Sequence, residues 1–198
     1  MVEMNTDIAA IRTRYAIAAG LTVWLVAGCS AGVETQANAF VPLIGSMAER
    51  LGTADQVALS KWDSGQPVYD PQREAQVIEN AVRVASDYGL SAEDATNIFV
   101  DQIEASKEVQ YALLDDWKRQ GSAPATPRQS LSGVIRPALD KLQISIMQNL
   151  QAVAPLRSTE NCRTQVALAV DQVVQQTSID VLHFVALDSA VARVCFKS

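Results

Sequence analysis

Five charged residues between positions 50 and 74 have types and spacing suited to holding a small anion. They are Arg50, Lys61, Asp70, Arg73 and Glu74. Apolar residues at helical spacing flank them in place of further charge, which favours a sheltered pocket over a solvated surface. In such a pocket a guanidinium or ammonium group binds an anion through charge-assisted hydrogen bonds. The stretch therefore predicts a binding site for a small anion.

Two further polar residues could complete this pocket. Ser106 and Gln110 are four apart, so on a helix they share one face. Taken singly, all seven residues have ordinary structural explanations. Asp70 can simply cap a helix, Glu74 can favour a helix N-terminus, and isolated cations are usually solvated. Their joint spacing is what favours a site.

The elements that must position these residues are helices. Apolar residues recur at i, i+3, i+4 and i+7, without the sustained alternation that strands show. The pattern predicts six helices, over residues 40–62 with a break near Gly52, 71–88, 91–118, 139–150, 159–174 and 178–191. Asp70 and Ser91 are expected as N-caps. Ser158 or Thr159 is expected to cap the fifth helix. We therefore expect one all-α domain, with a linker at residues 121–127.

Composition argues against several classes of function. The 198-residue chain has 16 Lys and Arg against 22 Asp and Glu, for a net charge of −6. It has no basic stripe, so nucleic acid is not an expected partner. His183, the only histidine, has apolar neighbours and is expected to be a core or boundary residue, so we expect no metal site and no cofactor. Trp62 and Trp117 are predicted to anchor the core.

The N-terminus indicates export. Arg12 and Arg14 precede an apolar run over residues 16–28, which Cys29 follows. A bilayer-spanning helix needs about 20 apolar residues, and this run is shorter. Residues 1–28 are therefore predicted to be a signal peptide.

The last residues of this segment, 26–29 (VAGC), resemble the bacterial lipobox, in which the cysteine is lipidated and becomes the new N-terminus. The chain then divides into a signal peptide (1–28), a short tether (29–39) and a helical domain (40–198). This predicts a periplasmic lipoprotein that a lipid on Cys29 holds at the membrane. Two alternatives remain open. Cleavage after Ala39 would release a soluble periplasmic or secreted protein, and an uncleaved segment would act as an anchor.

The other two cysteines are predicted to form a disulfide. Export places Cys162 and Cys195 in an oxidising compartment, where an even pair of cysteines usually oxidises. The bond would tie the start of the fifth helix to the end of the sixth. Two buried free thiols are the alternative.

The seven-residue set resembles the AroQ class of chorismate mutases, and most of all its exported γ subclass. The motif of that class is an Arg, a Lys eleven residues on, an Asp nine further, an Arg three beyond with an adjacent Glu, and then a Ser or Thr and a Gln or Glu four apart. This chain supplies Arg50, Lys61, Asp70, Arg73, Glu74, Ser106 and Gln110 at those spacings. The γ subclass adds a second helical half with an early Arg and a late disulfide, which Arg136 and the pair Cys162–Cys195 match. The resemblance covers about residues 40–196 and implies the six-helix AroQ fold.

The resemblance implies an intramolecular isomerase that rearranges chorismate to prephenate without a covalent intermediate. Such an enzyme must hold the two carboxylates of its substrate and stabilise the charge that develops on the breaking ether oxygen. By resemblance, Arg50, Arg73 and Arg136 hold the carboxylates. Lys61 and Gln110 donate to the ether oxygen.

The remaining residues have supporting roles by resemblance. Glu74 and the backbone near Asp70 take the ring hydroxyl, and Ser106 assists one carboxylate. Some γ members have Glu where this chain has the neutral amide of Gln110, which can donate at any pH.

Arg136 is followed by Pro137, and proline disfavours helical angles at the residue before it. We expect either a helix that starts at Pro137 with Arg136 at its mouth, or a kink after Arg136. Lys141, one turn further along, is the alternative if Arg136 does not reach the pocket.

Two other functions remain open. Isochorismate pyruvate lyases share the fold and have a similar cationic pocket, but the lipobox and the second half favour the mutase. A helical lipoprotein that binds a partner without catalysis is the other, and the intact set of Arg50, Lys61, Arg73 and Gln110 argues against it. A homodimer is also expected by resemblance.

Overall fold

A computed structural model describes residues 37–196, in which every regular element is helical. The α-helices are α1 (Val41–Gly52), α2 (Ala54–Ser64), α3 (Pro71–Ala85), α4 (Ala92–Gln120), α5 (Arg136–Val153), α6 (Cys162–Thr177) and α7 (Val181–Ala190). Thr53 alone separates α1 from α2 and is itself helical (φ −72°, ψ −15°), so the two form one interrupted helix. Counted in this way, the six expected helices and the all-α fold are confirmed.

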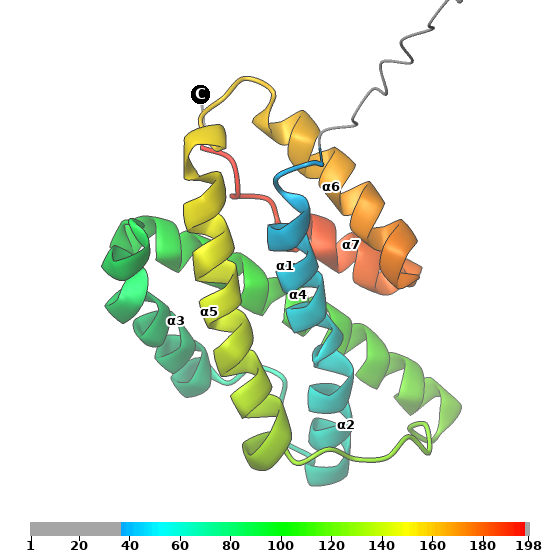
Figure 1. Cartoon of the computed structure of the whole chain (residues 1–198). Coiled ribbons are helices and arrows are strands. Elements are labelled where there is room, and N and C mark those ends of the chain that lie inside the picture. The colour runs from blue at the N-terminus through cyan, green and yellow to red at the C-terminus, as the bar shows by residue number, and fades with distance from the viewer. Residues whose placement is uncertain (1–36, 197–198) are drawn as a thin grey trace, which may run out of the picture. The chain divides into compact units, whose positions relative to one another are not determined.

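Helix α4 is the central element of the domain (Figure 1). Its 29 residues reach about 44 Å at 1.5 Å per residue. Helices α2, α3 and α7 pack along it, while α1 packs against α5 and α6. Residues far apart in the sequence therefore meet along one long helix.

The apolar stripe predicted for the first helix is buried. Phe40, Leu43, Ile44, Met47 and Leu51 are each 2% exposed or less. They pack in one cluster with apolar side chains of α4, α5, α6 and α7. Because the stripe repeats at i, i+3, i+4 and i+7, a single face of α1 brings all of these side chains to the core.

A smaller cluster lies between α2 and α4. Trp62 meets Trp117 edge to face, with ring centroids 6.1 Å apart, as expected for core anchors. The linker that follows α4 returns to this end, where Arg128 Nε donates to Asp63 Oδ2 at 2.9 Å. The ion pair holds the start of the second half against α2.

The predicted caps of α3 and α4 are confirmed. The carboxylate of Asp70 accepts from the backbone N–H of Arg73 at 3.1 Å, and the hydroxyl of Ser91 accepts from that of Asp94 at 3.0 Å. The first of these caps places the start of α3 directly after the loop that leads from α2.

The cap predicted for the fifth helix is wrong. Helix α6 begins at Cys162, and the residue before it makes no side-chain cap. Thr159 instead donates its hydroxyl to the carbonyl of Leu156, 2.7 Å away. A local turn thus competes with the helix for this hydroxyl, as is common for threonine. Ser158 and Thr159 end up in the turns between the 3-10 turn Ala154–Leu156 and α6.

The C-terminal segment is fixed by a disulfide and by a buried arginine. Cys162 and Cys195 are bonded, with their Cα atoms 6.0 Å apart, which confirms the predicted pair. Arg157, which no spacing in the sequence singled out, is 1% exposed. It binds Asp94 bidentately at 2.5 and 2.7 Å and donates Nε to the carbonyl of Val194. These bonds tie the chain beyond α7 to α4.

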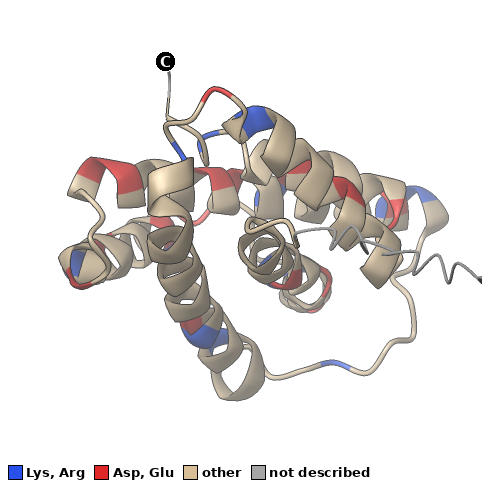
Figure 2. Cartoon of the chain, turned by 45° about the horizontal axis from the view of Figure 1, so that its top comes forward, with Lys and Arg blue, Asp and Glu red and all other residues tan. Residues whose placement is uncertain are grey.

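Residues 1–36, which contain the predicted signal peptide, Cys29 and most of the tether, lie outside the described residues. Within residues 37–196, no helix has the length and apolar character needed to cross a bilayer. Figure 2 shows Lys and Arg spread over several helices and the linker between α4 and α5, without a continuous basic stripe in the described part of the chain.

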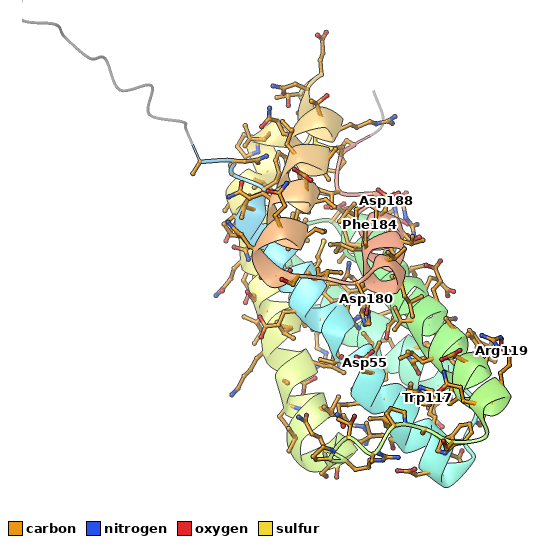
Figure 3. The ribbon with its side chains drawn as sticks, turned by 90° about the vertical axis from the view of Figure 1, so that its right-hand side faces the viewer. Asp55, Trp117, Arg119, Asp180, Phe184 and Asp188 are labelled. Atoms are coloured by element: carbon orange, nitrogen blue, oxygen red, sulfur yellow. A yellow bond between two sulfur atoms is a disulfide. The ribbon has the colours of Figure 1, made fainter. Side chains whose placement is uncertain are left out.

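His183 connects α7 to α2 through the carboxylate of Asp55, and it also bonds Asp180, the N-cap of its own helix. Its Nε2 lies 3.1 Å from Asp55 Oδ1, and its Nδ1 lies 2.9 Å from Asp180 Oδ1. Figure 3 shows Asp180 at the start of α7 near Asp55 on α2. The hydrogen bond to Asp55 is the main influence that raises the pKa of His183 to about 9, against partial burial, which lowers it, and with help from Asp180. The expected boundary position is confirmed, although its partners are acidic.

We predict that the ion pairs of His183 with Asp55 and Asp180, here called the His183 clamp, stabilise the fold at neutral pH and are lost at alkaline pH. Because the folded-state pKa lies above the ordinary value near 6.5, the stabilisation is fully present below pH 6.5 and is lost as pH rises through 9. Solvent screens the half-exposed carboxylates, so we expect the effect to be about 1 kcal/mol. Denaturant unfolding of the wild type and of His183→Gln at pH 6.5 and pH 10 measures it. The wild type should be the more stable at pH 6.5, and the gap should close at pH 10; a gap that stays constant would contradict the clamp.

Candidate active site

One pocket brings together all eight residues that the sequence analysis assigned to a binding site. They are Arg50, Lys61, Asp70, Arg73, Glu74, Ser106, Gln110 and Arg136. They come from α1, α2, the start of α3, α4 and the start of α5 (Figure 1). They converge because α2 and α3 both pack along α4. The set therefore forms one site in space, as its spacing in the sequence indicated.

Arg50 is the most buried charge in the pocket. Arg50 is 6% exposed, and its Nη1 donates to the carbonyl of Gln102 at 3.1 Å. Burial, with a further contribution from the charge of Arg73, lowers the pKa of Arg50 to about 10. Among residues 37–196 no carboxylate lies within ion-pair distance of this guanidinium. A buried cation in this state is stabilised by any anion that enters the pocket.

Lys61 is held by the loop between α2 and α3. Its ammonium group donates to the carbonyls of Pro67 and Val68. Burial is the main influence on its pKa and lowers it, although Asp70 and Glu74 act to raise it. An ammonium group has three protons and these carbonyls take two, so one donor remains for a ligand oxygen.

Ser106 and Gln110 share one face of α4, as their spacing predicted. Gln110 Nε2 donates to the carbonyl and to Oγ of Ser106, both at 3.1 Å. Gln110 is 5% exposed, and its Oε1 is buried without a hydrogen-bond partner among the described residues. An unsatisfied buried amide oxygen costs about 1–3 kcal/mol. A buried oxygen without a hydrogen bond is uncommon in native proteins, and it is often found where a ligand binds.

The two predicted carboxylates are held near the start of α3. Asp70 caps the helix, and Glu74 Oε1 accepts from the backbone N–H of Asp70 at 3.2 Å. Glu74 Oε2 pairs with Lys107 Nζ at 3.1 Å. Lys107 also lines the pocket, and the sequence analysis missed it. The signal was weak, because a lysine three residues after Glu104 on an amphipathic helix is typical of a surface pair.

Arg136 lines the same pocket from the second half of the chain. A π turn, Leu131–Ile135, runs directly into α5, so Arg136 keeps helical angles (φ −62°, ψ −45°) although Pro137 follows it. The helix thus begins one residue earlier than expected, without a start at Pro137. Lys141 is exposed and outside the lining, because five positions along a helix turn its side chain to another face.

The lining as a whole combines positive charge with apolar walls. Five cations and three carboxylates leave a formal charge of +2. The apolar lining residues are Val57, Val68, Val77, Ile103, Leu131, Ile135 and Leu139. This lining, which lies entirely within the described residues, contains neither histidine nor cysteine. It suits a dianion with an apolar body, which the cations can position and whose developing charge they can stabilise.

Comparison with known proteins gives the same family from sequence and from structure. A family model described as chorismate mutase type II matches residues 42–111. A secreted chorismate mutase of Mycolicibacterium smegmatis is 30% identical over 159 residues, which cover 80% of this chain and 87% of that protein. The crystal structure of a chorismate mutase from Burkholderia phymatum is 74% identical, with a TM-score of 0.80, and the match covers 81% of this chain and 98% of that one. For the chorismate mutase from Burkholderia thailandensis the identity is 34% and the TM-score 0.76, over 80% of this chain and 99% of that one. The chain therefore belongs to the chorismate mutase type II family.

Proposed function

We propose that this protein is a chorismate mutase that rearranges chorismate to prephenate in the pocket of Arg50, Lys61 and Arg73. Its family and its similarity to chorismate mutases over most of its length support this activity. The reaction is intramolecular, and its substrate has two carboxylates on an apolar ring framework. The formal charge of +2 and the apolar walls of the lining match those features.

The observation that most supports this function is the uncompensated positive charge of the pocket. Arg50 is buried with a lowered pKa, and Lys61 has backbone carbonyls as its partners. Arg73 donates to Gln76, a neutral side chain. Cations arranged in this way gain a counter-charge when a dicarboxylate binds.

The cations on three different helices would fix the conformation of the substrate. Arg50, Arg73 and Arg136 would each take a carboxylate oxygen, and bidentate pairing would add orientation. Ser106 would donate its hydroxyl to one carboxylate. Holding both carboxylates brings the enolpyruvyl arm over the ring, which places the reacting carbons close to their transition-state geometry.

Lys61 and Gln110 would stabilise the ether oxygen on which negative charge develops. Lys61 has one unused proton, and Gln110 has an amide whose oxygen lacks a partner. Nε2 would donate one proton to the ligand in place of Ser106 Oγ and keep the other on the Ser106 carbonyl, so the hydroxyl of Ser106 stays available to the substrate carboxylate. Both donors would then be stronger partners of the transition state than of the substrate, because charge on the oxygen grows as the bond breaks.

Glu74 and the backbone near Asp70 would receive the ring hydroxyl of the substrate. Each oxygen of Glu74 already accepts one hydrogen bond, from the Asp70 N–H and from Lys107. A carboxylate oxygen can accept more than one, so a hydroxyl donor can be added.

The protein is exported, as the family relatives named secreted chorismate mutases indicate. We propose further that Cys29 is lipidated and that residues 29–39 tether the domain. Asn38 Nδ2 donates to the carbonyl of Gln165 at 2.7 Å, and its Oδ1 accepts from the N–H of Phe40. Cleavage after Ala39 would remove these bonds, whereas processing at Cys29 keeps them. An intact mass equal to the unlipidated 40–198 segment would exclude the tether.

A homodimer is also proposed. Helix α7 exposes three apolar residues, Val181 by 79%, Phe184 by 43% and Val185 by 56%. Figure 3 labels Phe184 on this helix. Burial of such residues favours association. A monomer mass by light scattering at micromolar concentration would contradict the dimer.

We predict that purified residues 30–198 convert chorismate to prephenate and that Lys61→Ala lowers kcat by about 10²–10³-fold, the usual cost of one charge-stabilising donor. Lys141→Ala is the matched control, since that lysine is exposed and outside the pocket. The measurement is prephenate formation, with isochorismate assayed in parallel. Pyruvate released from isochorismate would indicate a lyase, and no turnover of either compound a binding protein. Near-normal kcat in Lys61→Ala would contradict the pocket assignment.

Arg50→Met should separate binding from stability. Methionine has a similar length and no charge to desolvate, so we expect the free energy of unfolding to rise by about 1 kcal/mol. Turnover should fall at least a hundredfold, because a carboxylate loses its buried partner. Denaturant unfolding and steady-state kinetics give the two numbers, and Arg83→Met on an exposed turn of α3 is the control. A variant that is less stable and fully active would contradict the role of Arg50.

Gln110→Glu should shift activity towards acid. The wild-type amide donates at every pH, so kcat should vary little between pH 6 and pH 8. A glutamate donates only when protonated, so kcat of the variant should fall about tenfold for each pH unit above its pKa. The measurement is kcat against pH for both proteins. An acid-dependent wild type would show that Gln110 is not the neutral donor.

A further inference from the structure

Lys107 lines the pocket, and none of the roles above uses it directly. Its side chain is 13% exposed, and Nζ lies 3.1 Å from Glu74 Oε2 and 2.7 Å from Glu104 Oε1. The ammonium also lies over the ring of Tyr69, 5.4 Å from the centroid. A lysine side chain is usually mobile, and these contacts with residues of α3, α4 and the preceding loop hold it in one place.

The partner of Lys107 is the carboxylate that most needs compensation. Glu74 is half-buried in a pocket suited to a dianion, where a bare carboxylate would repel both carboxylates of the ligand. Its Oε1 is already held by the N–H of Asp70, and Lys107 holds Oε2. Glu74 thus has a fixed orientation, and Lys107 offsets its charge within the pocket, while Glu104, the second partner of Lys107, is exposed and screened by solvent.

We propose that Lys107 is a positioning residue, which balances the charge of Glu74 and holds its carboxylate so that Glu74 accepts the substrate hydroxyl without repelling the substrate carboxylates. This inference rests on the proposed rearrangement of chorismate in the same pocket. In this role Lys107 affects how tightly the substrate binds, whereas Lys61 and Gln110 affect the rate of the reaction.

The kinetic consequence follows from where the hydroxyl lies. No bond to the hydroxyl changes in the rearrangement, so Glu74 contacts it equally in the ground state and in the transition state. Interactions of this kind alter KM and leave kcat nearly unchanged. Burial lowers the pKa of Lys107, but hydrogen bonds to Glu104 and Glu74 outweigh it and raise the pKa above its usual value. The lysine therefore stays charged, and the effect should be constant between pH 6 and pH 8.

The test is steady-state kinetics with chorismate on Lys107→Met, Glu74→Gln, the double variant and Lys107→Arg. We expect Lys107→Met to raise KM about tenfold with kcat within about threefold of wild type. Lys107→Arg should recover most of the loss, because a guanidinium keeps the ion pair. Lys118→Met, an exposed lysine further along α4, removes the same charge from the same helix and should change neither constant.

The double variant decides between positioning and direct contact. Once Glu74→Gln removes the charge, Lys107→Met should add less than about twofold to KM, because residues that act as a pair are not additive. A tenfold penalty that persists in the Glu74→Gln background would show that Lys107 touches the substrate itself and would overturn the proposal. A loss in kcat alone, or no loss at all in an active enzyme, would overturn it equally. Failure of the wild type to convert chorismate would instead overturn the proposed function, and this inference with it.

Discussion

Positive charge without a protein counter-ion is the constraint on which the rest of the domain depends. Arg50 is buried, its pKa is lowered, and Arg73 in the same pocket adds repulsion. Such a group destabilises the fold in the absence of ligand, so other contacts must hold it in place. Its hydrogen bond to the carbonyl of Gln102 fastens it to α4, the helix that also presents Gln110. Packing in the core offsets the cost of keeping the pocket charged.

The second half of the chain supports this arrangement from outside. Its disulfide fixes the segment beyond α7 to the start of α6, and the buried Arg157 ties the same segment to α4. His183 ties α7 to α2. Arg157 and His183 both reach helices that contribute pocket residues. The half that supplies one cation to the site thus also limits how far α2 and α4 can move apart. A rigid frame suits a reaction in which the enzyme chiefly positions its substrate.

Within the pocket, the carboxylate of Glu74 has a charged partner, whereas three of the cations have none among the described residues. Glu74 is compensated by Lys107, whereas Arg50, Lys61 and Arg73 have only neutral partners. The carboxylate is therefore neutralised in the empty protein and the cations are not. This difference favours an anionic ligand and lets a hydroxyl acceptor remain in the same cavity.

Local patterns in the chain were enough to predict the helices and the residues that line the pocket. Helical periodicity and the spacing of seven polar residues are local properties of the chain, and they predicted the burial of Phe40 and Met47 and the convergence of Arg50 with Gln110. Three features became visible only in the folded chain: Glu74 pairs with Lys107, His183 lies between two aspartates, and Arg136 stays helical before Pro137. The first two features arise where segments 33 and 128 residues apart pack together, and no period in the sequence records such a contact. The third arises because the turn Leu131–Ile135 leads directly into α5, a rarer local geometry than the one that proline usually imposes on the residue before it.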